Sequence, residues 1–316
     1  MVIKPANYEN ILRAAKHLRR GKVVAFPTET VYGLGADATN AEAVAQVFEM
    51  KGRPRFNPLI VHFANQEAAQ EHVRFNELAH KLARAFWPGP LSLVLPKSPG
   101  SPICDLVPAG LETVAVRVPQ HPIAQELLEE AACPVAAPSA NKAGRISPTT
   151  AEHVAEDLGS GPAMILDGAF SPIGLESTVV GLFDQTPRLL RPGAIAREDI
   201  ERLAGQPLTA GTDSHNPTSP GQLESHYAPN AKIRLEATSV EPGEALLAFG
   251  EDVPATDGPT VNLSSRGDIR EAAIHFFAAL RQLDSSGCEA IAVMPIPDEG
   301  LGEAINDRLR RAAAPR

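Results

Sequence analysis

The 316-residue chain has a formal net charge of −9, and this acid excess argues against a protein whose main task is binding nucleic acid, because neutralising phosphates requires surplus cations. Its 43% hydrophobic and 21% charged residues exclude disorder of the whole chain, and its length predicts about two domains. The sequence contains no run of about 18 apolar residues, so it predicts no transmembrane helix.

Residues 1–205 are predicted to mix helices and strands. Asn7 can cap a first helix, which Gly21 ends. Further helices are expected at residues 40–50, 77–86, 122–132, 151–158 and 197–203. Strands are expected at residues 22–27, 58–63, 91–95, 113–118, 135–137, 163–166, 177–183 and 188–190. Helical crossovers alternate with direct strand returns, which favours an α+β or mixed α/β fold over a strict βαβ repeat.

Residues 206–230 are rich in Pro, Thr, Ser and Gly and lack apolar periodicity, so they are predicted to form a linker. Beyond the linker, residues 231–316 are predicted to form a small open α/β domain. Its expected strands are 245–249, 260–263 and 290–294, and its expected helices are 269–283 and 301–312. The charge is divided unevenly, because residues 1–205 have a balance of −2 and residues 206–316 a balance of −7.

The cysteines and the start of the chain predict a cytoplasmic protein. Cys104, Cys133 and Cys288 are far apart and form no CxxC pair, which indicates neither a disulfide framework nor a zinc site and suits a reducing compartment. Residues 1–8 contain a lysine and a proline but no apolar segment typical of a secretory signal.

Two polar segments follow predicted secondary-structure elements and could bind a ligand. Residues 27–35 (PTETVYGLG) hold hydroxyls, a carboxylate and two glycines at a strand end, which is a usual ligand position in α/β sheets, although a polar turn would have the same composition. Residues 51–58 (KGRPRFNP) place three cations after a helix. They could clamp a polyphosphate, or they could interact with the dipole of the preceding helix.

Two predicted strands carry an isolated polar side chain. Alternation places His62 on the same face as Ile60, opposite the other apolar residues of that strand. A lone histidine in a strand is more often structural than catalytic. Arg117 stands among apolar residues and needs an anionic partner, which could be a protein carboxylate or the carboxylate of a substrate.

Hydrogen-bonding groups recur in the later loops. Ser139 and Asn141 are two residues apart in a loop that could bind a ligand or form an ordinary Asn/Gly turn. Arg191 follows another strand. His226 and Tyr227, which are neighbours in the sequence, stand in the predicted linker. They could take part in binding a ligand, or they could form a docking contact between the linker and a domain. The common phosphate-binding loop, the GxGxxG unit and the HExxH zinc motif are absent, so ATP would require a less common scaffold.

Taken in order, these segments resemble the YrdC-type L-threonylcarbamoyladenylate synthases in their two-domain form. The matching segments are PTETVYGLG, KGRPRFNPLIVH, AVRVP, APSANKAG, ESTVV, LRPG, the linker pieces SPG and HYAP, and the tail NLS…GLGEAINDRLRRAA. The resemblance implies a YrdC-like twisted sheet with a large cavity and a smaller, open, Rossmann-like α/β domain. It also implies an enzyme that condenses L-threonine, bicarbonate and ATP to threonylcarbamoyl-AMP and pyrophosphate. Separate threonylcarbamoyl transferase proteins would then use this product to modify tRNA.

The resemblance also implies roles for individual positions. The residues that match the family's catalytic set are Lys51, Arg53, Ser139 and Asn141. The residues expected to bind threonine are Thr30, His62, Arg117 and Ser177, with Arg117 holding the substrate carboxylate. The residues expected to bind ATP are Arg53, Asn57, Thr113, Ser139, Ser147, Arg191, His226 and Tyr227, the last two as part of a lid. Magnesium is implied as an ion held largely by phosphate oxygens and water, and no protein ligand is assigned to it.

The chain departs from the family pattern at one segment, and two other functions are considered. Between SPG and HYAP many relatives have basic residues, whereas this chain has the segment 222–225 (QLES), so the lid is not expected to contribute a cation to phosphate. One alternative is carbamoyl transfer through a carbamoyl-adenylate, as in hydrogenase-maturation relatives, which have additional cysteines that are missing here. The other is an RNA-binding module, which the charge disfavours. Stable binding to nucleic acid or to a membrane is not expected.

Overall fold

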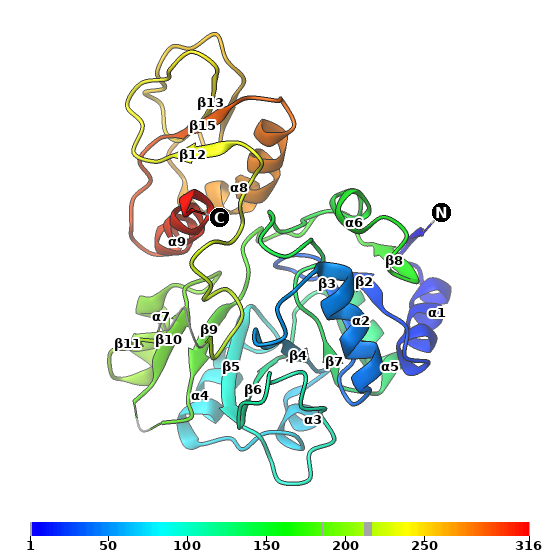
Figure 1. Cartoon of the computed structure of the whole chain (residues 1–316). Helices are drawn as coiled ribbons and strands as arrows, with labels where there is room; N and C mark the ends of the chain where they lie inside the picture. Colours follow the sequence, from blue (N-terminus) through cyan, green and yellow to red (C-terminus); the bar gives the residue numbers. More distant parts are fainter. Residues whose placement is uncertain (1, 185, 212–216, 316) are drawn as a thin grey trace.

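A computed structural model describes residues 2–184, 186–211 and 217–315, which build two sheets with flanking helices (Figure 1). A sheet of eleven strands forms the large lobe, and a sheet of four strands forms the small lobe at the top of the view. The predicted α/β class, with a twisted mixed sheet and a smaller α/β unit, is confirmed. Among the described residues, no helix is long and apolar enough to cross a membrane.

The large sheet mixes parallel and antiparallel neighbours in the order β1-β8-β2-β3-β7-β4-β6-β5-β9-β10-β11. Its strands are β1 (Ile3–Pro5), β2 (Val24–Phe26), β3 (Gly33–Asp37), β4 (Ile60–His62), β5 (Leu91–Pro96), β6 (Thr113–Arg117), β7 (Val135–Ala136), β8 (Met164–Asp167), β9 (Thr178–Gly181), β10 (Arg188–Arg191) and β11 (Thr209–Ala210). Its helices are α1 (Tyr8–Arg19), α2 (Ala41–Lys51), α3 (Gln66–Gln70), α4 (Glu77–Phe86), α5 (Pro122–Ala131), α6 (Ala151–Leu158) and α7 (Arg197–Ala204).

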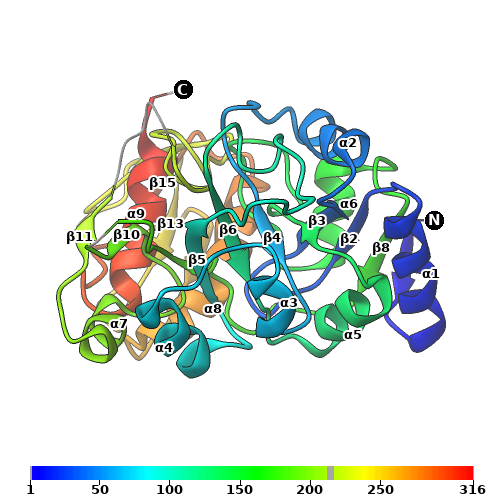
Figure 2. The ribbon, with the colours of Figure 1, turned by 90° about the horizontal axis from the view of Figure 1, so that it is seen from below.

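Local capping and strand alternation explain how these elements form and pack. The side chain of Asn7 accepts a hydrogen bond from the Asn10 amide at the start of α1, and Gly52 ends α2 in the left-handed conformation. In β2, Val24 packs in the cluster formed with α1 and α5, whereas Ala25 belongs to the core on the opposite face. Figure 2 shows α1 and α5 side by side at one end of the sheet.

The centre of the sheet has one apolar face and one face with polar residues. In the strand around β4, Leu59, Val61 and Phe63 join the main core, while Ile60 and His62 face the other side. The predicted alternation is therefore confirmed. The strands β4 and β6 are parallel, and His62 pairs with Arg117 in their register, so both side chains reach the same edge of the sheet.

The small lobe is a parallel sheet in the order β12-β15-β13-β14. Its elements are β12 (Lys232–Arg234), β13 (Glu244–Ala248), β14 (Thr260–Asn262), β15 (Ala290–Val293), α8 (Ile269–Asp284) and α9 (Leu301–Ala313). The apolar cluster of this lobe also contains Val31, Ile146 and Leu175 of the large lobe. A partly buried ion pair of 2.6 Å between Arg281 and Asp157 adds to the contact. The two lobes therefore share one packed interface.

The strand β3 lies where a polar loop was predicted. Its glycines weaken the strand signal, but they are required by the packing. A Cβ atom at Gly35 would lie 2.7 Å from the Phe26 ring and 2.9 Å from Val135. The short elements β1, α3, β11 and β12 were also not predicted. The segment 217–228 of the predicted linker is mostly buried, whereas residues 212–216 of that prediction lie outside the described residues.

Candidate active site

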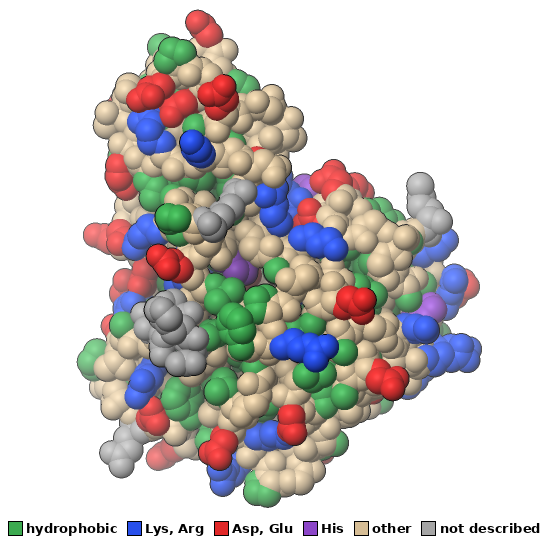
Figure 3. Space-filling model, in the orientation of Figure 1, with side chains coloured by type: hydrophobic (Ala, Val, Ile, Leu, Met, Phe, Trp, Pro, Cys, Tyr) green, Lys and Arg blue, Asp and Glu red, His purple; other side chains and the backbone are tan. Residues whose placement is uncertain are grey.

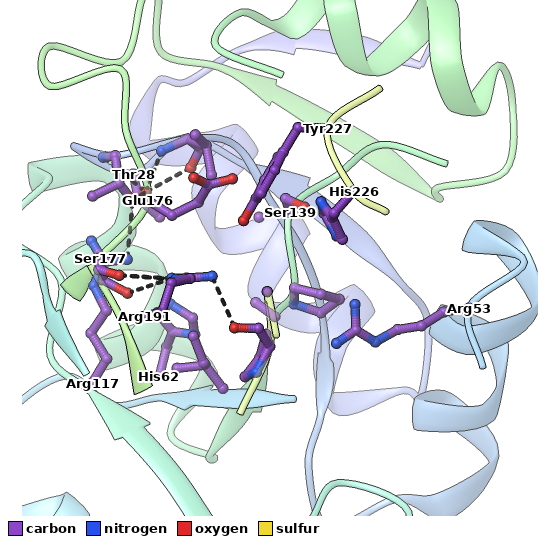
Figure 4. Close-up of a pocket in the computed structure, with 18 residues that line it drawn as sticks. Thr28, Arg53, His62, Arg117, Ser139, Glu176, Ser177, Arg191, His226 and Tyr227 are labelled. Atoms are coloured by element: carbon purple, nitrogen blue, oxygen red, sulfur yellow. Dashed lines mark hydrogen bonds between the residues drawn. The ribbon is translucent and has the colours of Figure 1, made fainter. Parts of the chain in front are cut away.

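A small cavity of about 50 Å³ lies over the polar face at the centre of the large sheet. Its walls come from β4, β6, the loops at residues 28–33, 137–139 and 176–177, and the segment 220–227 (Figure 4). Figure 4 shows Arg53 on the opposite side of the cavity from Ser177 and Arg117. The cavity therefore brings together groups that are separated by up to 200 residues in the sequence.

The structure brings most, but not all, of the predicted site residues to this cavity. Those that line it are Thr30, Arg53, His62, Arg117, Ser139, Ser177, Arg191, His226 and Tyr227. Those that do not are Lys51, Asn57, Thr113, Asn141 and Ser147. Thr113 begins β6 and Arg117 ends it, so at about 3.3 Å per residue they lie about 13 Å apart.

Arg53 is a buried cation without a carboxylate partner within the described ranges. Its Nε donates to the backbone oxygen of Asn57 at 3.1 Å, and its Nη2 donates to Asn57 Oδ1 at 2.6 Å and to the oxygen of Pro58 at 2.9 Å. Burial, with a smaller effect from the nearby Arg191, lowers the pKa of Arg53 from 12.5 to about 9. The guanidinium is therefore held in place by neutral groups and remains available to an anion.

Lys51 supports the loop of Ser139 and Asn141 instead of lining the cavity. Its Nζ donates to the backbone oxygens of both residues at 2.6 Å. Burial, assisted by the charge of Arg53, lowers the pKa of Lys51 well below its ordinary value. The Asn141 side chain donates to the backbone oxygens of Lys142 and Arg145, and its buried Oδ1 has no hydrogen-bond partner among the described residues.

Arg117 already has an anionic partner in the protein. Its Nη2 forms a buried ion pair of 2.6 Å with Glu29, and its Nη1 donates to Thr30 Oγ1 at 3.0 Å. Of the two anionic partners that the sequence left open for Arg117, the structure provides the protein carboxylate. The other oxygen of Glu29, Oε2, is buried without a hydrogen bond in the described structure, although Glu29 itself does not line the cavity.

Arg191 lines the cavity, and its guanidinium is held by hydrogen bonds to neutral groups. Its Nη2 donates to the backbone oxygen of Ser177 at 2.8 Å and to Ser177 Oγ at 3.1 Å, and its Nη1 lies 3.5 Å from the oxygen of Pro220. Burial lowers the pKa of Arg191. Arg191 thus resembles Arg53, because each is a buried guanidinium without a carboxylate partner in the parts of the chain that the structure describes.

His226 and Tyr227 cover the cavity from the segment that was predicted to be a linker (Figure 4). The centres of the two rings lie 4.0 Å apart with the ring planes tilted by 58°, and Tyr227 has a positive φ of 63°. Burial and the nearby cations, Arg53 foremost, hold the pKa of His226 well below its ordinary value. On the sheet below, burial lowers the pKa of His62 from 6.5 to about 3. Both imidazoles are therefore neutral at neutral pH.

Glu176 was not predicted as a site residue, although it lines the cavity. Its Oε1 accepts from the hydroxyl of Ser147 at 2.6 Å, and its Oε2 accepts from Nε of Arg308 in α9 at 3.2 Å. Ser147 thus reaches the cavity through Glu176. A carboxylate just before an apolar strand, in the sequence ESTVV, was the available signal for Glu176.

The charge of the cavity differs from the charge of the surface. Figure 3 shows acidic side chains gathered on the small lobe, in agreement with the acid excess of residues 206–316. No group of three or more His, Cys, Asp or Glu side chains in the described residues is arranged to hold a metal ion. Apart from the carboxylate of Glu176, which is paired with Arg308, the cavity offers guanidinium groups, hydroxyls and neutral imidazoles, which suits a ligand with several negative charges.

The fold and the cavity define the class of protein. The model of one sequence family, described as "Telomere recombination" and comprising Sua5, YciO and YrdC, matches residues 16–193. A second model, described as "Threonylcarbamoyl-AMP synthase, C-terminal domain", matches residues 195–314. The chain therefore belongs to the Sua5/YrdC family in its two-domain form, as the motifs predicted.

Individual relatives match almost the whole chain. The threonylcarbamoyl-AMP synthase of Pyrococcus abyssi is 42% identical, covering 95% of this chain and 93% of its own. That of Bacillus subtilis is also 42% identical, covering 98% and 94%. The crystal structure of P. abyssi Sua5 with L-threonine matches with a TM-score of 0.90 and 39% identity, covering 99% of this chain and 96% of its own. A P. abyssi Sua5 variant, in which an adjacent histidine and tyrosine are changed to alanine, has the same TM-score.

Proposed function

We propose that this enzyme condenses L-threonine, bicarbonate and ATP to threonylcarbamoyl-AMP and pyrophosphate. The observation that supports the proposal is a cavity with two buried arginines, Arg53 and Arg191, held only by neutral groups across the described ranges. Two such guanidinium groups repel each other and suit a polyanion. The choice of this particular reaction is supported by relatives that match almost the whole chain and are named threonylcarbamoyl-AMP synthase.

The proposed chemistry requires positioning and charge stabilisation more than covalent participation of the protein. The amine of threonine attacks the carbon of bicarbonate, and water is lost to leave a carbamate. A carbamate oxygen then attacks the α-phosphorus of ATP, and the bond to pyrophosphate breaks. Negative charge accumulates on the phosphate oxygens during this step, so fixed cations lower its barrier.

We assign the ATP side of the cavity to Arg53 and Arg191. Asn57 fixes the guanidinium of Arg53 through two hydrogen bonds, so its proposed contribution to ATP binding is indirect. Ser147 contributes through Glu176. Thr113 is retained as an ATP contact only as an expectation from the resemblance, since it lies outside the cavity wall.

We assign the threonine side to Arg117, Thr30, His62 and Ser177. Glu29 and Thr30 already hold the Arg117 guanidinium in a fixed orientation, which prepares it to share a charge-assisted hydrogen bond with the carboxylate of threonine. The neutral His62 has a buried Nδ1 that lacks a hydrogen bond among the described groups. It can therefore accept from or donate to the substrate without adding charge.

In this proposal, Lys51 and Asn141 do not contact the substrates and act on them indirectly. Lys51 orders the loop by binding the backbone oxygens of Ser139 and Asn141. The loop thereby presents Ser139 to the cavity, where its hydroxyl is proposed to bind the nucleotide. The matched catalytic set thus divides into groups that face the substrates, which are Arg53 and Ser139, and groups that shape the loop.

We further propose that residues 1–205 form the catalytic domain, residues 206–230 a linker and lid, and residues 231–316 a second domain. His226 and Tyr227 would exclude water from the hydrolysable adenylate. Because the described residues offer no cluster of metal ligands, magnesium is proposed to enter with ATP, held by phosphate oxygens and water. The product would pass, in the cytoplasm, to separate proteins that transfer the threonylcarbamoyl group to tRNA.

Pyrophosphate release tests the proposal. ATP with threonine and bicarbonate is expected to yield pyrophosphate and a mass corresponding to threonylcarbamoyl-AMP, whereas omission of either co-substrate stops both. Release that is indifferent to threonine and bicarbonate would contradict the proposal. A filter-binding titration with tRNA at low salt tests the RNA-binding alternative, because that alternative requires tight binding without ATP.

A further inference from the structure

The small lobe places one fully buried arginine against the wall of the cavity. Arg308 lies on α9, has 0% exposed surface and forms a buried ion pair of 3.2 Å with Glu176. Its Nη1 also donates to the backbone oxygen of Pro192 at 2.6 Å. Its Cζ atom lies 5.4 Å from the centre of the Tyr227 ring, in the range of a cation–π contact.

Each of these contacts lies at the cavity or one residue away from it. Glu176 lines the cavity itself, Pro192 directly follows Arg191, and Tyr227 is part of the covering segment. One guanidinium therefore connects three wall segments that are distant in sequence. All three must be correctly placed for the cavity to exist in its observed shape.

The same helix also holds the backbone of the covering segment. The Arg311 guanidinium donates to the backbone oxygen of Leu223 at 2.6 Å, and its own backbone oxygen accepts from the amide of His226 at 3.2 Å. A single residue of α9 thus fixes the chain on either side of residues 224–225. The contact is built from oriented hydrogen bonds as well as apolar packing.

Stability alone does not account for Arg308. A buried ion pair is weak evidence for stability, because well-packed apolar side chains of similar size often serve as well or better. Its Nη2 is buried without a hydrogen-bond partner among the described residues, which adds a desolvation cost. The oriented contacts to Glu176, Pro192 and Tyr227 are what an apolar side chain could not reproduce.

We propose that Arg308 is a positioning residue of the active site, through which the small lobe sets the placement of Glu176, the loop after Arg191 and the covering Tyr227. The inference rests on the proposed function for its catalytic consequence. It gives the small lobe a specific task, namely to hold the cavity in the arrangement that binds the substrates. Arg308 itself does not line the cavity, so it acts on the substrates through these neighbours.

The test compares Arg308→Met with Arg310→Met in the full-length enzyme. Arg310 lies on the same helix, and its side chain is 57% exposed, so it is a matched control. We expect Arg308→Met to lower kcat/KM for pyrophosphate release by at least about tenfold and Arg310→Met to leave it unchanged. An Arg308→Met enzyme with the wild-type kcat/KM would overturn the proposal.

A double variant separates positioning from general damage. Glu176→Gln removes the charge that Arg308→Met leaves unpaired, so in the Glu176→Gln background the additional loss caused by Arg308→Met is expected to fall below about threefold. An equal loss in both backgrounds would overturn action through Glu176. If Arg308→Met does not fold, Arg308→Lys replaces it. Lysine keeps the charge but lacks the fork that reaches several partners, so Arg308→Lys is also expected to lower kcat/KM by at least about tenfold, and a wild-type kcat/KM would overturn the proposal.

Protease cleavage gives a readout that does not depend on the reaction. Tyr227 is 1% exposed, so chymotrypsin should cut after it slowly in the wild-type enzyme and in Arg310→Met, and much faster in Arg308→Met at equal melting temperature. Equal cleavage in all three would overturn the proposal. If the wild-type protein releases no pyrophosphate, the proposed function fails, and cleavage alone then decides whether Arg308 holds Tyr227.

Discussion

Replacing Arg53 by methionine separates the contribution of the buried guanidinium to folding from its contribution to binding. The pKa of Arg53 falls from 12.5 to about 9 on burial. At about 1.4 kcal/mol per pH unit, this corresponds to a cost of about 5 kcal/mol for keeping the charge inside the ligand-free protein. Methionine has a similar length and carries no charge, so it removes this cost.

The three hydrogen bonds of Arg53 act in the opposite direction. Bonds from a charged donor contribute about 1.5 kcal/mol each at the lower end of their range, or about 4–5 kcal/mol together. The two effects nearly cancel, so Arg53→Met is expected to change the free energy of unfolding by less than about 2 kcal/mol. The affinity for ATP should nevertheless fall by about tenfold to a hundredfold, because a charge-assisted contact to phosphate is lost.

Urea denaturation without ligand and calorimetric titration with ATP measure the two quantities separately. Arg55→Met is the control, because Arg55 lies in the same loop and is exposed. It should change neither quantity. If Arg53→Met lowers the free energy of unfolding by more than about 3 kcal/mol, the guanidinium is mainly structural. An unchanged affinity for ATP would refute the assignment of Arg53 to the phosphates.

Three further predictions concern the cavity wall. Because burial lowers the pKa of His62 from 6.5 to about 3, the unfolded chain binds more protons between these values and stability falls with decreasing pH. The wild-type protein should therefore lose about 2.5 kcal/mol of its free energy of unfolding between about pH 7 and about pH 4.5 because of His62, and His62→Asn should abolish this loss. An unchanged dependence of the unfolding free energy on pH, measured by urea denaturation, would contradict the prediction. Glu29→Gln should lower the free energy of unfolding by about 3 kcal/mol by leaving Arg117 with a neutral partner, and wild-type stability would show that the ion pair contributes little. Gly221→Ala places a Cβ atom 2.6 Å from Cδ of Arg191 at a φ of 87°, so the KM for ATP should rise about tenfold; an unchanged KM would count against Arg191 as an ATP contact.

Local signals in the sequence were sufficient for many of the elements. The Asn7 cap and the Gly52 end of α2 depend only on neighbouring residues, so they could be predicted. The alternation that places His62 opposite Val61 depends only on strand geometry. In contrast, β3 could not be predicted, because its glycine at position 35 is required by the Phe26 ring, which belongs to another strand.

The candidate site was predictable as a set of motifs but not as a set of contacts. Order and spacing identified the residues Arg53, Ser139 and Arg191 as members of one family pattern. They did not reveal that Lys51 binds backbone oxygens beneath the loop, or that Glu29 pairs with Arg117. Such pairings join residues about 90 positions apart, and no local rule connects them.

The sequence by itself determined the family, the α/β class, the ends of the main helices and most of the residues around the cavity. These follow from motif order, periodicity and capping, which are properties of short segments. Only the tertiary structure decided which of the buried cations have a carboxylate partner and that the small lobe reaches the cavity through Arg308. The physical reason is that the energy of a buried charge depends on what surrounds it in space, and these neighbours come from distant parts of the chain.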